Sequence, residues 1–96
     1  MVTDYELTLI LNPEVTEDKY KGTIDKVSQL ITGKGGAVSS VDPWGKKRMT
    51  FPIKRFREGN YVLMKCKMEP KVITELEANL KLTEEVLRHL LIKVES

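Results

Sequence analysis

The chain has 96 residues, of which 41% are hydrophobic and 31% charged, with a formal net charge of +2. This balance is typical of a small globular domain and excludes a disordered chain, while the apolar runs are shorter than the roughly 18 residues of a membrane-spanning helix. One cysteine, Cys66, excludes an internal disulfide framework and is compatible with the reducing cytoplasm. We therefore expect one domain over residues 1–96 in the cytoplasm, with no membrane partner.

The first predicted element is a strand over residues 5–11. Its odd-numbered positions, from Tyr5 to Leu11, are all apolar and would share one buried face of a sheet. Asn12-Pro13 ends the strand, because proline lacks an amide donor and restricts the residue before it.

A helix is predicted next, with Thr16 as its N-cap. An apolar stripe at helical spacing indicates one buried face, and the glycines that follow are typical of a helix end. The stripe consists of Tyr20, Ile24, Val27 and Ile31, and the glycines are Gly33, Gly35 and Gly36.

Two strands are expected in the middle of the chain. The first runs from Ala37 through Ile53, with a bend at Pro43 or Gly45, and the second covers residues 61–68. Between them, residues 55–60 read as a turn that ends in Gly59-Asn60.

The last predicted elements are a helix that begins near Pro70 and a strand over residues 86–94, joined by a connection over 82–85. The order β-α-β-β-α-β is that of the α+β ferredoxin-like fold, a four-stranded antiparallel sheet with two helices on one face. Because the third and last strands carry apolar residues on both faces, the face without helices is a candidate partner surface.

The basic residues are concentrated in one segment. Residues 46–67 hold eight basic residues and one acidic residue, a net charge of +7, whereas the rest of the chain holds eight basic and thirteen acidic residues, a net charge of −5. Such segregation favours a polyanionic partner, although a solvated basic hairpin would have the same composition.

The residues that catalysis or metal binding requires are sparse. With one histidine and one cysteine, a Cys/His metal cluster is excluded and a Ser-His-Asp triad is not indicated. His89 and Cys66 both fall in apolar strands, where packing is the simpler interpretation. We therefore expect no enzyme activity, no cofactor, no metal and no small-molecule substrate.

An RNA-recognition motif has the same element order and stacks bases on aromatic residues of its third strand. Here residues 59–64 echo that strand only faintly, since most of the expected aromatic positions are aliphatic. Binding of RNA through cations, backbone and shape is expected instead.

The hairpin sequence is more distinctive. Trp44-Gly45-Lys46-Lys47-Arg48-Met49-Thr50-Phe51-Pro52-Ile53 resembles the segment that marks the bacterial small-ribosomal-subunit protein S-six family. The resemblance extends in the same order over essentially the whole chain, through Tyr5-Glu6, Asn12-Pro13, Tyr61-Val62-Leu63-Met64 and Val86-Leu87-Arg88-His89-Leu90-Leu91-Ile92-Lys93.

This resemblance implies a structural protein of the small subunit that binds the central domain of small-subunit ribosomal RNA together with ribosomal protein S-eighteen, as a heterodimer. It also implies which residues contact RNA or the partner: basic positions of the hairpin and last strand, and two aromatic positions. For each of them the alternative is a solvated cation or a core aromatic. The candidates are Tyr5, Lys46, Lys47, Arg48, Phe51, Lys54, Arg55, Arg88 and Lys93.

Two other classes of protein share this fold. A metabolite-binding or regulatory domain would leave the basic hairpin without a function. A small enzyme of the acylphosphatase type would need a phosphate-binding loop after the first strand, where Asn12-Pro13-Glu14 instead provides a proline and an acid.

Overall fold

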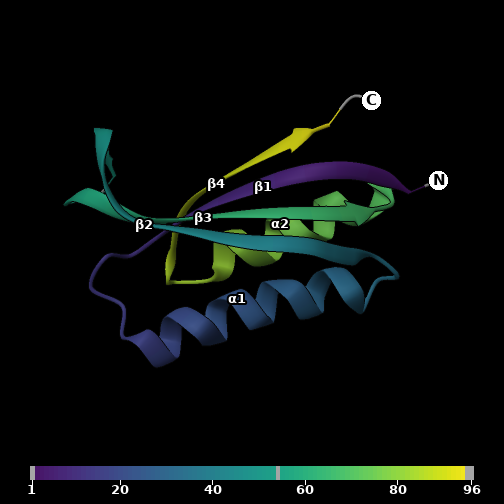
Figure 1. The fold of residues 1–96 in the computed structure, drawn as a ribbon, viewed down its shortest axis with the longest axis horizontal. Helices are drawn as coiled ribbons and strands as arrows, with labels where there is room; N and C mark the ends of the chain where they lie inside the picture. Colours follow the sequence, from purple (N-terminus) through teal and green to yellow (C-terminus); the bar gives the residue numbers. More distant parts are fainter. Residues whose placement is uncertain (1, 54, 95–96) are drawn as a thin grey trace.

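The sheet of this protein has the strand order β2-β3-β1-β4, and every neighbouring pair is antiparallel. In the computed structural model, which describes residues 2–53 and 55–94, both helices lie on one face of this sheet (Figure 1). This arrangement confirms the predicted ferredoxin-like fold. The elements are β1 (Thr3–Leu11), α1 (Glu17–Thr32), β2 (Ala37–Ile53), β3 (Phe56–Met68), a 3₁₀ turn η1 (Pro70–Val72), α2 (Ile73–Leu82) and β4 (Val86–Lys93).

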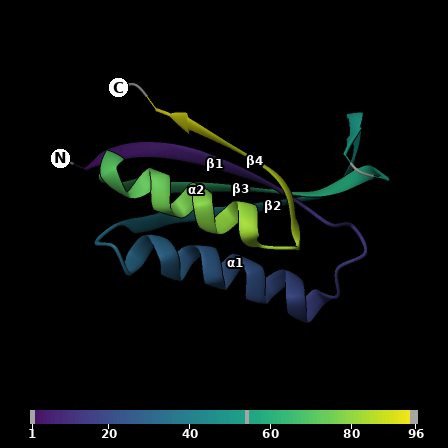
Figure 2. The ribbon, with the colours of Figure 1, turned by 180° about the vertical axis from the view of Figure 1, so that it is seen from behind.

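The core lies between the sheet and the two helices. The odd-numbered residues of β1 from Tyr5 to Leu11 are buried there, as their alternation predicts. Seen from behind, α2 lies beneath β1 and β3, with α1 beside it (Figure 2). The core residues from the other elements are Val27 and Ile31 of α1, Val62, Met64, Cys66 and Met68 of β3, Val72 of η1, and Leu76 and Leu80 of α2.

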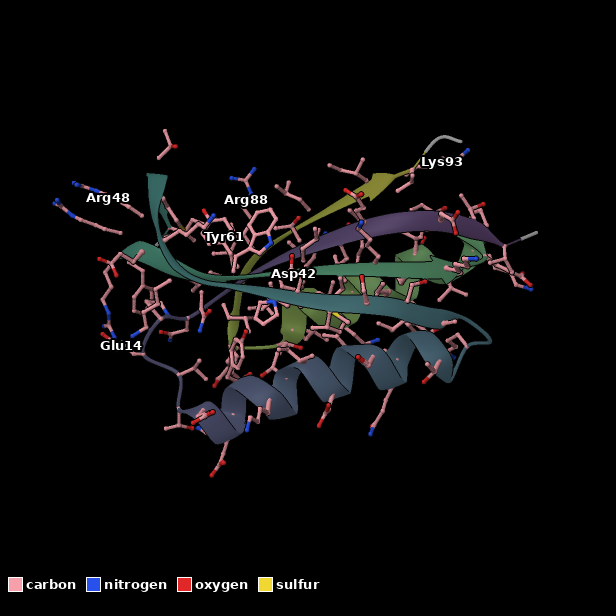
Figure 3. The ribbon with its side chains drawn as sticks, viewed as in Figure 1. Glu14, Asp42, Arg48, Tyr61, Arg88 and Lys93 are labelled. Atoms are coloured by element: carbon pink, nitrogen blue, oxygen red, sulfur yellow. The ribbon has the colours of Figure 1, made fainter. Side chains whose placement is uncertain are left out.

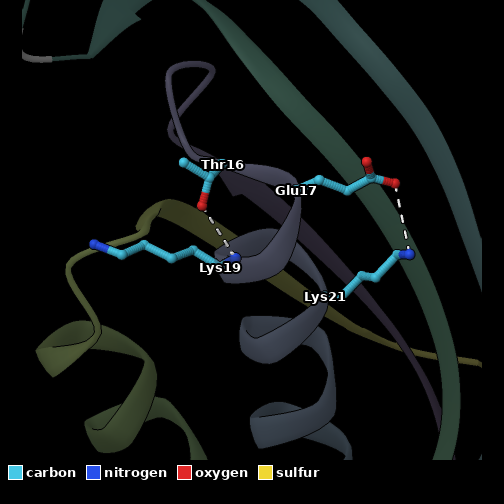
Figure 4. Close-up of polar contacts among 4 residues, drawn as sticks. All are labelled: Thr16, Glu17, Lys19 and Lys21. Atoms are coloured by element: carbon cyan, nitrogen blue, oxygen red, sulfur yellow. Dashed lines mark hydrogen bonds and ion pairs between the residues drawn. The ribbon is translucent and has the colours of Figure 1, made fainter.

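The start of α1 carries the predicted cap. The hydroxyl oxygen of Thr16 accepts a hydrogen bond from the backbone N–H of Lys19 at 3.3 Å, and Lys21 pairs with Glu17 at 3.5 Å one turn further on (Figure 4). The cap satisfies one of the amide donors that a helix leaves without an internal partner. The helix ends at Thr32, where the N–H of Gly33 donates to the carbonyl of Gln29.

The β2-β3 hairpin is long and projects beyond the helices (Figure 1). The pairing register shifts between Pro43 and Gly45, where the sequence predicts a bend, and Gly45 has a φ of 83°. This conformation is costly for residues with a β-carbon and accounts for the glycine. The irregularity divides β2 into a part that lies over the helices and a part that lies beyond them.

The predicted turn over residues 55–60 is wrong. Ile53 pairs with Phe56, and the residues from Phe56 to Asn60 already belong to β3. Gly59-Asn60 resembles a turn signal in the sequence, yet both residues pair with β2, at Lys47 and Lys46. The strand therefore extends five residues further into the basic hairpin than predicted.

Candidate RNA- and partner-binding surface

The face of the sheet opposite the helices, here called the open face, is built from rows of paired residues. Residues that pair across antiparallel strands lie side by side on one face. Ile10 of β1 pairs with Tyr61 of β3 and Arg88 of β4, and Thr8 pairs with Leu63 and Leu90. The next row consists of Glu6, Lys65 and Ile92.

A hollow of about 220 Å³ lies on the open face where the hairpin meets β4. Its lining is mostly apolar and includes one strong cation, Arg88. Tyr61 and Arg88 both lie on the side of the sheet away from α1 (Figure 3). The hollow can accept a flat or apolar group next to a guanidinium donor. The lining residues are Ile10, Met49, Thr50, Ile53, Tyr61, Arg88 and Leu90.

The part of the open face near the chain ends is apolar and electrically balanced. Leu90 is 45% exposed and Ile92 is 58% exposed. The charges beside them occur in opposite-sign pairs, with Lys67 4.0 Å from Asp4 and Lys65 next to Glu6 in the register. An uncovered apolar surface of this kind is typical of a protein contact.

The projecting hairpin carries most of the predicted cations. Lys46, Lys47 and Arg48 are exposed and pair with Asn60, Gly59 and Glu58, so their side chains alternate between the two faces of the ribbon. Arg48 extends from the far end of the hairpin (Figure 3). Arg55 is exposed at the turn, with its guanidinium carbon 5.3 Å from the centroid of the Phe56 ring.

These cations are available to an outside anion. Within residues 2–53 and 55–94, Lys46, Lys47, Arg48, Arg55 and Arg88 make no ion pair with another described side chain. The carboxylates in the described ion pairs instead contact other cations, which lie on α1, the segment after it, β3, η1 and β4. Phosphates and the carboxylates of a protein partner are the anions that such a set of ammonium and guanidinium donors suits.

The remaining predicted residues do not join this cluster. Tyr5 is only 6% exposed and packs in the core beneath the sheet, so little of it is available for a surface contact. Lys93 pairs with Tyr5 and so points to the opposite face from Arg88; it is exposed at the other end of β4 (Figure 3). Phe51 belongs to β2, its side chain lies outside the described part of the structure, and Lys54 is outside the described residues.

Trp44 is a surface residue that is not among the contact residues predicted from the sequence. Its indole N–H donates to the Asp42 carboxylate at 3.0 Å, and the Lys47 ammonium lies 4.7 Å from the centroid of the ring. Asp42 and Lys47 pair with Leu63 and Gly59 and thereby place this group on the open face. The signal in the sequence was a single tryptophan directly before the basic run.

Cys66 and His89 face the helix side, away from these cations. Burial raises the pKa of the Cys66 thiol to about 11, which keeps it protonated and unreactive near neutral pH. The Nε2 atom of His89 lies 2.8 Å from the Glu77 carboxylate and ties β4 to α2. Across the described residues no group of three His, Cys, Asp or Glu side chains is arranged to hold a metal ion.

Neither helix among the described residues has the length and apolar composition that a membrane span requires.

The sequence model of the Ribosomal protein S6 family matches residues 4–93. Small ribosomal subunit protein bS6 of Moorella thermoacetica is 40% identical over 92 residues, which cover 96% of this chain and 94% of that protein. The corresponding protein of Thermoanaerobacter pseudethanolicus is 40% identical over 91 residues, covering 95% and 96%.

The fold agrees with a solved structure. The crystal structure of 30S ribosomal protein S6 from Thermotoga maritima superposes with a TM-score of 0.91, covering 98% of this chain and 89% of that one, at 24% sequence identity. The match over residues 4–93 and the 40% identity of full-length relatives confirm the resemblance noted in the hairpin. The chain therefore belongs to the ribosomal protein S6 family, as a structural, non-enzymatic protein of the small ribosomal subunit in the cytoplasm.

Proposed function

We propose that this protein binds the central domain of small-subunit ribosomal RNA together with ribosomal protein S-eighteen, through two adjoining parts of the surface described above. The projecting hairpin and Arg88 bind the RNA, and the apolar part of the open face binds the protein partner. The observation that carries the proposal is the pairing of Ile10 with both Tyr61 and Arg88, because it joins the basic hairpin and β4 into one surface.

The RNA part of the proposal rests on charge and exposure. Lys46, Lys47, Arg48, Arg55 and Arg88 are exposed cations, and none of them is engaged by a described carboxylate. RNA phosphates supply the missing counter-charge and release bound cations into solution, which makes such binding sensitive to salt. Lys54 and Phe51 join this proposal on the strength of the sequence resemblance alone.

The partner part rests on the uncovered apolar rows. Leu90 and Ile92 are substantially exposed beside the balanced charges of Glu6 and Lys65, which suits a protein surface better than a polyanion. Lys93 is exposed on the edge strand but points away from the open face, so it joins this proposal on the strength of the sequence resemblance alone. Tyr5 supports this surface from the core.

The test is binding to a central-domain RNA fragment, with and without S-eighteen, across a series of salt concentrations. We expect tight, salt-sensitive binding that requires or is greatly strengthened by the partner. Absence of binding under both conditions would reject the proposal and favour a ligand-binding domain on the same fold.

A matched pair of variants separates the protein contact from a loss of folding. Ile92→Glu places a charge in the apolar part of the open face and should abolish the heterodimer. Leu82→Glu makes the same kind of change at the end of α2, where Leu82 is 83% exposed, and should leave the heterodimer intact. Equal effects of both variants would remove the open face from the proposal.

A further inference from the structure

We propose that Trp44 is the aromatic contact for an unpaired RNA base, so that the surface recognises a base as well as phosphates. This inference rests on the proposed function and adds a recognition element that the predicted set of cations lacks. It follows from the arrangement of Asp42, Trp44 and Lys47 on the open face.

The first argument is that Trp44 is not held by the core. The residue is 45% exposed and is absent from the buried cluster beneath the helices. The exposed half of the indole contributes no hydrophobic stabilisation to the fold, and it would do so only in a complex in which a ligand covers it. The same ring carries a single N–H donor, and that donor is already bonded to Asp42.

The second argument is that the ring is positioned before any ligand arrives. The bond of 3.0 Å to Asp42 fixes the edge of the indole, and the Lys47 ammonium lies 4.7 Å from its centroid. Trp44 is the extra residue at the register shift, and the residues on either side of it pair with β3, Pro43 with Val62 and Gly45 with Tyr61. A fixed aromatic ring loses little conformational freedom when a base stacks on it.

The third argument is the charge around the ring. The Lys47 ammonium lies over the ring on the open face, whereas the register places Lys46 and Arg48 on the other face of the ribbon. A nucleotide at Trp44 therefore meets an aromatic surface and one phosphate-binding donor together. An ammonium that attracts the ring can also reach the phosphate of a stacked nucleotide. Stacking accepts any base, because every base has a π-face, so the contact selects unpaired nucleotides rather than a sequence.

The experiment uses the intrinsic fluorescence of the full chain, in which Trp44 is the only tryptophan. We expect the emission to be quenched as the central-domain RNA fragment is added in the presence of S-eighteen, and the ring to become less accessible to acrylamide. Inorganic polyphosphate, which provides phosphates without bases, should occupy the cations without this quenching. Quenching by S-eighteen alone, with no further change on addition of RNA, would assign Trp44 to the protein contact and overturn the proposal.

Two substitutions give an independent readout. Trp44→Leu should weaken RNA binding by roughly 5- to 150-fold, the range expected for one stacked base, while leaving its salt dependence unchanged. Trp44→Phe keeps an aromatic ring and should lose much less. Circular dichroism confirms that both variants fold, and the wild-type fluorescence test does not depend on them.

The outcomes distinguish this proposal from the one on which it rests. RNA binding without any change in emission, together with wild-type affinity of Trp44→Leu, would overturn base stacking and leave the RNA-binding function standing. No RNA binding by the wild-type protein, with or without the partner, would overturn both.

Discussion

Gly59 of β3 lies directly against Ile10 of β1, so closely that a β-carbon at position 59 would overlap the Cγ2 methyl of Ile10. Ile10 is itself almost fully buried, although it lies on the open face. The absence of a side chain at Gly59 therefore allows Ile10 to fill the floor of the hollow beside Tyr61 and Arg88.

Gly59→Ala should accordingly destabilise the protein by about 1–3 kcal/mol, the usual cost of an additional group in a packed site. The free energy of unfolding in urea measures this. Gly22→Ala is the matched control, because Gly22 lies within α1 with no atom near its missing β-carbon, and there alanine should stabilise by about 0.5–1 kcal/mol. If both variants were stabilised alike, the close packing of Gly59 against Ile10 would be refuted.

Arg88→Ala should weaken RNA binding and lower the slope of the log affinity against log salt by roughly 0.7–0.9, the amount expected for one phosphate contact. The measurement is a set of binding isotherms from low to moderate salt with the central-domain fragment and S-eighteen. Lys21→Ala removes the same charge from an exposed position on α1, away from the open face, and should change the slope little. An unchanged slope for Arg88→Ala would exclude Arg88 from phosphate binding.

Cys66 should react slowly with iodoacetamide in the native protein. Burial raises its pKa from 9.0 to about 11, which lowers the thiolate fraction at pH 8 by about 100-fold, and closed packing slows the reagent further. Mass spectrometry of the alkylated protein measures the rate, with the urea-unfolded chain as reference. Similar rates in both states would show that the thiol is accessible in the fold.

The same pKa shift makes a prediction about stability at high pH. Because the folded state holds the Cys66 proton more tightly than the unfolded state, this contribution is complete below pH 9 and is lost as the pH rises from 9 to 11. The free energy of unfolding should therefore fall more steeply over this range in the wild type than in Cys66→Ala. If stability fell equally with pH in the two proteins, the raised pKa of Cys66 would not contribute to stability in this range.

Thr16→Ala should destabilise the protein by about 1 kcal/mol, since the N–H of Lys19 loses its hydrogen-bond acceptor. Thr16→Ser retains a capping hydroxyl and should stay close to wild type. Thermal or urea unfolding measures the stability of both variants relative to wild type. A loss of the same size in Thr16→Ser would show that the methyl group of Thr16, and not its cap, provides the stability.

The elements that were predicted well are those in which a local pattern and the tertiary environment agree. Alternation in β1 placed Tyr5 and Leu11 on the buried face, and Thr16 capped α1, because short-range chemistry decides both features. The prediction of a turn over residues 55–60 failed for the opposite reason. Glycine followed by asparagine is common in turns, but Gly59 instead makes room for the side chain of Ile10, which lies on a strand far away in the sequence.

The candidate surface shows the same division. The basic residues of the hairpin were evident from composition, but their combination with Arg88 depends on the register between β1, β3 and β4, which the sequence alone does not provide. Register also separates Lys93 from Arg88, placing the two cations on opposite faces of β4. The family resemblance made Tyr5 a candidate surface contact, whereas the alternation of β1 and the packing of the helices both place it in the core.

The position of β1 has a consequence for biosynthesis. This strand is made before the other three, yet it lies in the interior of the sheet, and its residue Tyr5 pairs with Lys93 of β4. While the chain is emerging from the ribosome, the edge of β1 that β4 will cover stays open until β4 itself has been translated. A nascent chain arrested before Val86 should therefore remain sensitive to proteases and prone to aggregate, since folding must wait for pairing between opposite ends of the sequence.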